Sequence, residues 1–206
     1  MSDPEKRVLI LFAHPSTERS EVNMPLYEAS TGREGVTVVD LYAEYPDYRI
    51  NVEREQQRLR DHDVIIFMFP LYWYSTPSML KEWQDLVLEY GWAYGKGGTA
   101  LAGKTFLCAI TAGGRESAYR DQGYNHYTVR ELLRPLEQTA VLCGMHYLPP
   151  FALFGARTAV EEGRLEDHVA QWRVLLHRLQ QGELVPADLD LFEQIQHYLS
   201  DDRGGA

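Results

Sequence analysis

The stretch VLILFAHPSTERSEVN, from Val8 to Asn23, decides the fold class of this 206-residue chain. Its apolar half, VLILFA, predicts a β-strand covered on both faces, because apolar residues occupy consecutive positions instead of alternating with polar ones. Its polar half, which begins at His14, is longer than a surface turn needs and carries hydroxyl, amide and imidazole donors. The stretch therefore predicts a buried strand that ends in a loop able to hold a small anion.

Short apolar runs alternate with longer amphipathic segments along the rest of the chain. Strands are predicted at 8–13, 36–41, 63–70, 104–111 and 146–155, and helices at 22–31, 52–60, 77–90, 127–143 and 158–181. Strict alternation of strands and helices predicts an α/β fold with right-handed crossovers. We therefore expect a three-layer sandwich, in which helices cover both faces of a five-stranded parallel sheet.

One domain is expected over residues 1–182, followed by a separate tail over residues 183–206. After a proline, the tail predicts one short amphipathic helix with an apolar face made of Leu189, Phe192, Ile195 and Leu199. A lone helix of this length is marginal in water, so we expect it to pack back on the domain or on a partner.

Composition and charge exclude several classes of protein. The formal net charge of −10 argues against a nucleic-acid binder, and it means that any phosphate must be held by local donors. No apolar run approaches the roughly 18 residues that cross a bilayer, and the charged N-terminus is not typical of a secretory signal. A cytoplasmic protein is therefore expected, with Cys108 and Cys143 as buried thiols.

Three informative loops follow the first, third and fourth predicted strands. They are the loop that ends at Asn23, the sequence FPLYWYSTP (69–77) and the sequence TAGGRESAY (111–119). The carboxyl ends of parallel strands meet at one edge of a sheet, and a doubly wound sheet binds its ligand there. The three loops are therefore predicted to form one ligand site.

The first loop has the features of a phosphate site. A helix is predicted to begin near Asn23, so Ser20 and Glu21 fall where free N–H groups and the helix dipole favour an anion. The side chains of Ser20, Asn23 and His14 add donors. The loop matches neither the GxGxxG fingerprint nor the P-loop pattern. The alternative is that Ser20 is an ordinary helix cap.

The second loop carries three consecutive aromatic residues, Tyr72, Trp73 and Tyr74, between two prolines. Their density at the ligand edge favours a flat aromatic ligand lying against the rings. The alternative is that the rings pack beneath the following helix.

The third loop contains Gly113 and Gly114, which let the backbone approach a ligand closely, or which simply form a turn. Tyr119 and Asn125 follow at a distance that would bring them back over the same pocket. A further segment, YGWAYGKGGTALAGK (90–104), is a long aromatic loop of a kind typical of functional sites and interfaces, with a flexible connection as the alternative.

The order of these motifs is similar to that of a known family. The motifs that carry the likeness are, in order, AHP followed by Ser20 and Asn23, FPLYWYSTP, GWAYGKGGTALAGK, and TAGG followed by ESAY. Two further segments, YPDYRINVEREQQ and HYLPPFALFG, add to the match. The chain resembles the flavodoxin-like NAD(P)H:quinone oxidoreductases, and among them most closely the ancillary subunits of glutathione-regulated potassium-efflux systems. The resemblance covers roughly residues 8–155, with the motifs in order, and more loosely the last helix.

The resemblance implies a flavodoxin-like sandwich that binds FMN at the three loops. The residues around the phosphate would be His14, Ser20, Glu21, Val22 and Asn23, and those along the flavin ring would be Leu71, Tyr72, Trp73 and Tyr74. The polar edge of the ring would meet Thr111, Ala112, Gly113 and Gly114. Trp92 and Tyr94, with His126, would line the substrate pocket. No metal is implied, because the redox chemistry belongs to the flavin.

The resemblance also assigns catalytic roles to Tyr119 and Asn125. In the family a tyrosine at the position of Tyr119 lies near the end of the flavin where negative charge collects on reduction. The mammalian-type enzymes have a histidine where this chain has Asn125, and His126 is shifted by one position. Since an amide carries no proton at neutral pH, proton delivery would fall to Tyr119, to water or to His126.

The function that follows is a two-electron transfer from NADH or NADPH, through FMN, to a quinone-like acceptor with ping-pong kinetics. Arg115 and Arg120 could each meet a nicotinamide phosphate, and the alternative is that both are simply solvated. A homodimer is expected, with Trp92 and Tyr94 reaching the partner's site. The alternative is a regulatory ancillary subunit on the cytosolic face of a potassium-efflux antiporter, peripheral to the membrane, and a third possibility is a scaffold without flavin.

Overall fold

The structure is a computed structural model that describes residues 4–184, 186–189 and 191–201. The strands are β1 (Val8–Phe12), β2 (Val36–Asp40), β3 (Val64–Pro70), β4 (Thr105–Ala112), β5 (His146–Tyr147) and β6 (Phe151–Phe154). They form one parallel sheet in the order β2-β1-β3-β4-β5, and β6 also pairs with β4. The prediction of an α/β fold with a parallel sheet is confirmed.

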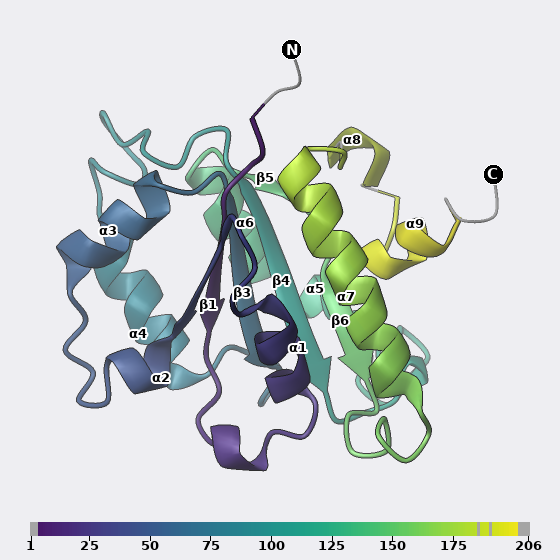
Figure 1. Cartoon of the computed structure of the whole chain (residues 1–206). Helices are drawn as coiled ribbons and strands as arrows, with labels where there is room; N and C mark the ends of the chain where they lie inside the picture. Colours follow the sequence, from purple (N-terminus) through teal and green to yellow (C-terminus); the bar gives the residue numbers. More distant parts are fainter. Residues whose placement is uncertain (1–3, 185, 190, 202–206) are drawn as a thin grey trace.

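Helices cover both faces of the sheet (Figure 1). They are α1 (Asn23–Ser30), α2 (Leu41–Glu44), α3 (Val52–Arg60), α4 (Ser78–Val87), α5 (Val129–Leu132), α6 (Arg134–Leu142), α7 (Arg164–Gln181), α8 (Pro186–Leu189) and α9 (Ile195–Asp201), with short 3₁₀ turns η1 (Thr17–Arg19) and η2 (Glu116–Ala118). The helices α2 to α6 pack on one face, and α1, α7, α8 and α9 on the other. Among the described residues, no helix is long and apolar enough to cross a membrane.

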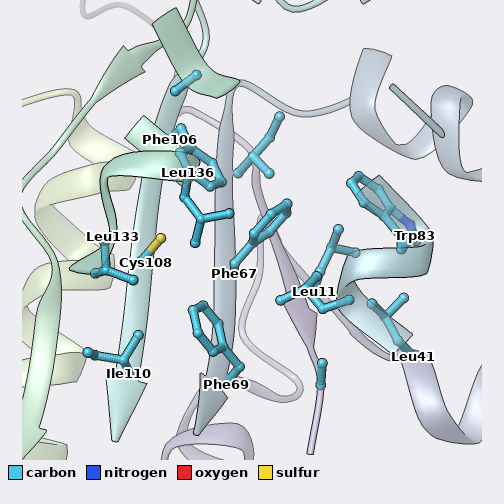
Figure 2. Close-up of a cluster of buried hydrophobic side chains, with 14 of the residues drawn as sticks. Leu11, Leu41, Phe67, Phe69, Trp83, Phe106, Cys108, Ile110, Leu133 and Leu136 are labelled. Atoms are coloured by element: carbon cyan, nitrogen blue, oxygen red, sulfur yellow. The ribbon is translucent and has the colours of Figure 1, made fainter. Parts of the chain in front are cut away.

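The central strands are apolar throughout because both of their faces are covered. Leu11 and Phe67 point to the α4 side, whereas Ile10 and Ile66 point to the α7 side. Figure 2 shows the first of these layers, where the rings of Phe67 and Trp83 meet edge to face at a centroid distance of 5.6 Å. This two-sided core fixes the carboxyl ends of β1, β3 and β4, from which the predicted site loops start.

The predicted strand over residues 146–155 is wrong as a continuous element. It is divided into β5 and β6 by Pro149 and Pro150, both of which lack the N–H that a strand ladder requires. Both pieces nevertheless pair with β4 in parallel. The sheet therefore has five strand positions, and the last of them is interrupted.

Several predicted helices differ from the structure at their ends. The segment 127–143 forms two helices, α5 and α6, because Pro135 sits in the first turn of α6 and cannot continue a helix from α5. The segment 158–181 becomes helical only from Arg164, after Gly163 in the left-handed region at φ 68°. The predicted helix 77–90 ends earlier, at Val87.

The predicted single helix of the tail is instead two short helices, α8 and α9. Leu189, Ile195 and Leu199 are buried in the apolar layer that contains α7, so the segment packs back on the sheet domain. Phe192 lies between the two helices and is half-buried. Three of the four predicted apolar positions therefore contribute to the core, but not from one helical face, and the Phe192 ring instead contacts Tyr198 at a centroid distance of 5.5 Å.

Candidate functional site

The strand order reverses at β1, because β2 lies on one side of this strand and β3 on the other. A hollow of about 370 Å³ opens where the loops after β1, β3 and β4 converge. Of the residues predicted to hold a cofactor, His14, Ser20, Glu21, Val22, Asn23, Leu71, Tyr72, Thr111 and Gly113 line it. The three loops, far apart in sequence, thus share one cavity at the topological switch point.

One end of the hollow is formed by the N-terminus of α1. The N–H group of Asn23 donates to Ser20 Oγ at 3.1 Å, so Ser20 satisfies the first N–H of α1 although the N-cap residue is Val22, and its own hydroxyl hydrogen is still available. The N–H groups of Glu21 and Val22 find no acceptor among the described residues. Unsatisfied donors at a helix N-terminus are well suited to bind a phosphate.

Asn23 joins this end of the hollow to the end of β4. Its side chain is 3% exposed, and Nδ2 donates to Thr111 Oγ1 at 3.0 Å, while the Thr111 hydroxyl lies 3.2 Å from Asn23 Oδ1. One hydrogen of the Asn23 amide is used in this pair, and the second can be donated to a ligand. The pair therefore fixes a donor at the floor of the cavity.

His14 presents a second donor to the hollow. Its Nδ1 accepts from the N–H of Ser16 at 3.1 Å, which leaves the proton of the neutral ring on Nε2, 3.5 Å from the hydroxyl of Tyr72. Burial lowers the pKa of His14 below its ordinary value, and the Asp40 carboxylate opposes the shift. His14 is consequently neutral near pH 7 in the ligand-free protein.

A phosphate bound beside His14 is expected to raise the pKa of this ring, so that binding takes up a proton as the pH falls through the raised pKa. FMN affinity should then rise more on going from pH 8 to pH 6 in the wild type than in the His14→Gln variant. The difference between the two proteins cancels the titration of the phosphate itself. Equal pH dependence of the dissociation constant in both proteins would exclude this role for His14.

The aromatic loop after β3 has an unusual backbone. Trp73 and Tyr74 adopt φ values of 49° and 61°, and the N–H of Ser75 donates to the carbonyl of Tyr72 at 3.0 Å. Two consecutive left-handed residues form the kind of tight turn that normally takes Asn-Gly. Bulky side chains in this region cost roughly 1–2 kcal/mol each, and such strain is typical of functional sites.

Trp73 is 93% exposed at the tip of this turn, beside the hollow but not lining it. The Trp73→Asn variant is expected to raise the free energy of unfolding by about 1 kcal/mol, because Asn tolerates the left-handed region and no buried contact is lost. The same change should weaken FMN binding several-fold by removing a ring. Chemical denaturation and flavin titration measure the two effects. Trp73→Phe, which keeps both the ring and the strain, should show neither effect, and a less stable Trp73→Asn variant would contradict the argument.

Tyr119 and Asn125 lie close to each other and to Tyr74 of the aromatic turn. Tyr74 donates its hydroxyl to Asn125 Oδ1 at 3.1 Å. Burial raises the pKa of Tyr119, the nearby Tyr74 adds to the rise, and the Gly114 backbone and the Asn125 side chain oppose it. The Tyr119 hydroxyl therefore keeps its proton across the physiological range and can act as a donor.

Some predicted residues are not part of the hollow. Ala112 is a buried residue of β4 whose carbonyl accepts from Ala156 N–H, and Gly114 packs against the ring of Tyr119. His126 is exposed and has a left-handed backbone at φ 62°. These three residues border the site or lie beside it.

Trp92 and Tyr94 lie at the opposite edge of the sheet, near the amino ends of the strands. The guanidinium of Arg60 stands 5.3 Å from the centroid of the Trp92 ring, and Lys104, just before β4, donates to the carbonyl of Arg60 at 3.2 Å. Figure 1 shows the 90–104 segment at the top of the view and the loop between β1 and α1 at the bottom. The two aromatic residues therefore do not reach the hollow of their own chain.

Sequence analysis missed three residues of the hollow, Pro70, Ala156 and Arg157. Arg157 follows β6 and supplies a cation at the edge where a phosphate is predicted. The signal was present, since the loop after the last strand must lie at the same edge as the other three loops.

The cavity fits a flavin nucleotide. A side chain added at Gly113 would meet no atom within 4 Å, so the position opens onto free space where a planar ring can approach the backbone. The free N–H groups at one end of the hollow suit the anionic tail of such a nucleotide. The aromatic side chains along the hollow, and the phenol beyond them, suit its flat polar ring.

A family model described as a flavodoxin-like fold matches residues 6–176. The chain belongs to the flavodoxin-like family. The strand order and the ligand hollow beside β1 are those expected for this family, and the sequence prediction of a flavodoxin-like sandwich is confirmed.

Similar proteins of the flavodoxin-like family carry informative names. The glutathione-regulated potassium-efflux system ancillary protein KefG of Serratia proteamaculans is 49% identical over 172 residues, which cover 84% of this chain and 93% of that protein. General stress protein 14 of Treponema denticola, solved in complex with FMN, is 38% identical with a TM-score of 0.78, covering 84% of this chain and 99% of that one. A NADPH-quinone reductase from P. pentosaceus is 30% identical with a TM-score of 0.73, covering 82% and 96%.

Proposed function

We propose that this protein is an FMN-dependent NAD(P)H:quinone oxidoreductase, which transfers two electrons from NADH or NADPH to a quinone-like acceptor. The observation that carries the proposal is the convergence of the loops after β1, β3 and β4 on one hollow with anion donors at one end and aromatic rings at its side. The FMN complex of the Treponema relative and the name of the P. pentosaceus reductase support it.

The phosphate of FMN would be held by local donors, because the chain as a whole is negative. The N–H groups of Glu21 and Val22 face the anion together with the Asn23 amide, and the Arg157 guanidinium lies at the same edge. His14 adds an imidazole N–H. Hydrogen bonds of this kind to a charged group are each worth about 1.5–3 kcal/mol.

The ring of FMN would lie along the second and third loops. Leu71 and Tyr72 line the hollow, Trp73 stands beside it, and Gly113 and Thr111 bring polar backbone and hydroxyl groups close. Bound FMN supplies the electron-transfer chemistry, and the protein binds it, orients it and shapes the pocket. One pocket used in turn by the nucleotide and the acceptor gives ping-pong kinetics.

Tyr119 would supply the hydrogen-bond donor at the end of the ring where negative charge collects. Its raised pKa keeps the hydroxyl protonated, and Asn125 holds the neighbouring phenol of Tyr74. Since Asn125 cannot carry a proton, the donor function rests with Tyr119 and with water. His126 remains a candidate only from its exposed position beside Asn125.

A homodimer is part of this proposal. Trp92 and Tyr94 lie far from the hollow of their own chain, so they would contribute to a substrate pocket only across an interface with a second copy. Light scattering at micromolar concentration is expected to give the mass of two chains. The mass of one chain would remove this part of the proposal.

A second role is favoured by the identity of 49% with an ancillary protein of a potassium-efflux system. In that role the protein is cytoplasmic, binds the cytosolic face of an antiporter and keeps FMN as a structural or sensing group. The two roles are compatible, because docking would use a surface away from the cofactor hollow.

Purified protein tests the proposal directly. We expect a yellow preparation that binds one FMN per chain and oxidises NADPH or NADH when menadione is added. A yellow protein without turnover would favour the regulatory role. A colourless protein that cannot be loaded with FMN would contradict both roles and favour a scaffold without flavin.

A further inference from the structure

The segment from 191 to 201 lies beyond the part of the chain that the family model matches, which ends at residue 176. It nevertheless contacts the loop that carries Tyr119. Figure 1 shows α9 beside α7 and near β6, so the segment runs along the edge of the domain next to the end of the sheet. Its contacts link the core on one side to the third cofactor loop on the other.

The segment is anchored in the core by apolar and backbone contacts. Ile195 and Leu199 are buried in the layer with α7, and the N–H of Ile195 donates to the carbonyl of Pro150 at 3.1 Å. The amide of Gln196 pairs with both backbone groups of Ala152, donating to the carbonyl at 2.6 Å and accepting from the N–H at 3.2 Å. Gln196 thus occupies the open hydrogen-bonding edge of β6 as an additional strand would.

From this anchor, Gln194 extends to the third loop. Its Nε2 donates to Glu116 Oε1 at 2.8 Å, and its Oε1 accepts from Gln196 at 2.6 Å. Gln194 is 4% exposed and is therefore held in place, whereas the Glu116 carboxylate that it binds is half-exposed. A second contact, from Arg130 to the carbonyl of Phe192 at 3.1 Å, holds the helix that follows the loop.

Glu116 is the residue on which the local structure around Tyr119 depends. It is the first residue of η2, and its carbonyl accepts from the N–H of Tyr119 at 2.9 Å. Two residues further, the carbonyl of Ala118 accepts from the N–H of Asn125 at 2.9 Å. The predicted catalytic pair is therefore tied to the turn whose first side chain is held by Gln194.

The loop does not rest on the core alone. A hollow of about 420 Å³ lies beneath it, lined by Tyr119 and Val129 on the loop side and by Phe192 and Gln194 on the side of the C-terminal segment. The ring of Tyr119 touches the core through Phe154, at a centroid distance of 5.1 Å. The hydrogen bond from Gln194 to Glu116, both of which line this hollow, joins its two sides.

We propose that Gln194 is a positioning residue, which acts through Glu116 to hold Tyr119 and Asn125 against the cofactor hollow. This inference rests on the proposed function for its catalytic consequence, although the link between segment and loop exists without a cofactor. The C-terminal segment, which lies outside the part of the chain that the family model matches, would then support the third loop.

The Gln194→Glu variant tests the link with little change in volume. It keeps the acceptor for Gln196 but replaces the donor to Glu116 with a like charge. In the ligand-free protein, amide hydrogen exchange over residues 116–125 should accelerate about tenfold, as expected when a hydrogen bond to a charged group that anchors a local unit is lost. With FMN, the dissociation constant should rise and kcat fall by about fivefold each.

Glu116→Gln combined with Gln194→Glu provides the rescue, because one side chain again donates and the other accepts. Exchange over 116–125, FMN affinity and kcat should return to within about twofold of the wild type. Ser200→Ala is the matched control, because Ser200 belongs to the same C-terminal segment, in α9, and its hydroxyl donates to the carbonyl of Gln196. Faster exchange confined to residues 191–201, or no rescue by the double variant, would overturn the inference. Failure of the wild type to bind FMN would instead overturn the proposed function, since the exchange measurement does not need the cofactor.

Discussion

Replacing Asn23 by aspartate is expected to weaken FMN binding by about 100-fold or more, because it puts a carboxylate beside the phosphate. The change conserves shape, and the residue is buried between Ser20 and Thr111, where a charge is poorly screened. Two unit charges about 4 Å apart near a protein surface repel by about 4 kcal/mol. Titration of the apoprotein with FMN, followed by flavin fluorescence, measures the dissociation constant.

Riboflavin provides the matched control, since it has the same ring but no phosphate. Asn23→Asp should bind riboflavin about as well as the wild type does, so the loss is specific to the anionic tail. Asn23→Ala, which removes the amide without adding charge, should weaken FMN binding by only about tenfold. Equal losses for FMN and riboflavin would show that Asn23 holds the loop together and does not read the phosphate.

The position of the candidate site could be predicted from the sequence because it depends on the topology of the sheet more than on side-chain packing. The consecutive apolar residues of Val8–Phe12, Val64–Pro70 and Thr105–Ala112 identify strands buried on both faces, and parallel strands place their following loops at one edge. Neither step requires knowledge of side-chain packing. The same argument explains why nine of the thirteen predicted cofactor residues line one hollow, although no single loop was decisive.

The details that the sequence did not reveal are set by local conformations and long-range contacts. The left-handed backbone of Trp73 and Tyr74 contradicts the usual preference of bulky residues, so no turn rule would assign it. The sequence shows the two consecutive prolines, Pro149 and Pro150, that break the last strand. It does not show that both pieces pair with the same strand, because this depends on their contacts with β4. The support of Glu116 by Gln194 joins residues 78 positions apart and has no periodic signal.

Trp92 and Tyr94 show a different limit of prediction from the sequence. The sequence places them in a long aromatic loop, and the connection of α4 to β4 must carry that loop to the edge opposite the cofactor hollow. The resemblance predicts that they reach the substrate pocket of a second chain, and they lie far from the hollow of their own chain. Their role therefore depends on oligomeric state, which neither the pattern of residues nor the fold of one chain specifies.

Replacing Tyr119 by phenylalanine is expected to lower kcat by about 100-fold while FMN affinity changes little, because in the proposed function the hydroxyl donates where charge develops during the reaction and not where the phosphate is held. Removing one donor of this kind typically costs a factor of about 100 to 1,000 in kcat. The ring of Tyr119 contacts Phe154, and phenylalanine keeps this contact, so the loop should retain its place. Steady-state rates with NADPH and menadione, together with FMN titration, separate the two effects.

Tyr74→Phe is the matched control, because it removes the hydroxyl that bonds to Asn125 but leaves Tyr119 unchanged. Its effect on kcat should be several-fold smaller.

The pH dependence of the rate tests the same assignment. Because burial raises the pKa of Tyr119, loss of the Tyr119 proton should lower the wild-type rate only above the ordinary pKa range of a phenol. Asn125→His should introduce a new dependence near pH 6.5, the ordinary pKa of histidine, if this position lies close enough to share proton delivery. A Tyr119→Phe enzyme with normal kcat would mean that water alone performs the task, and the catalytic role of the third loop would have to be abandoned.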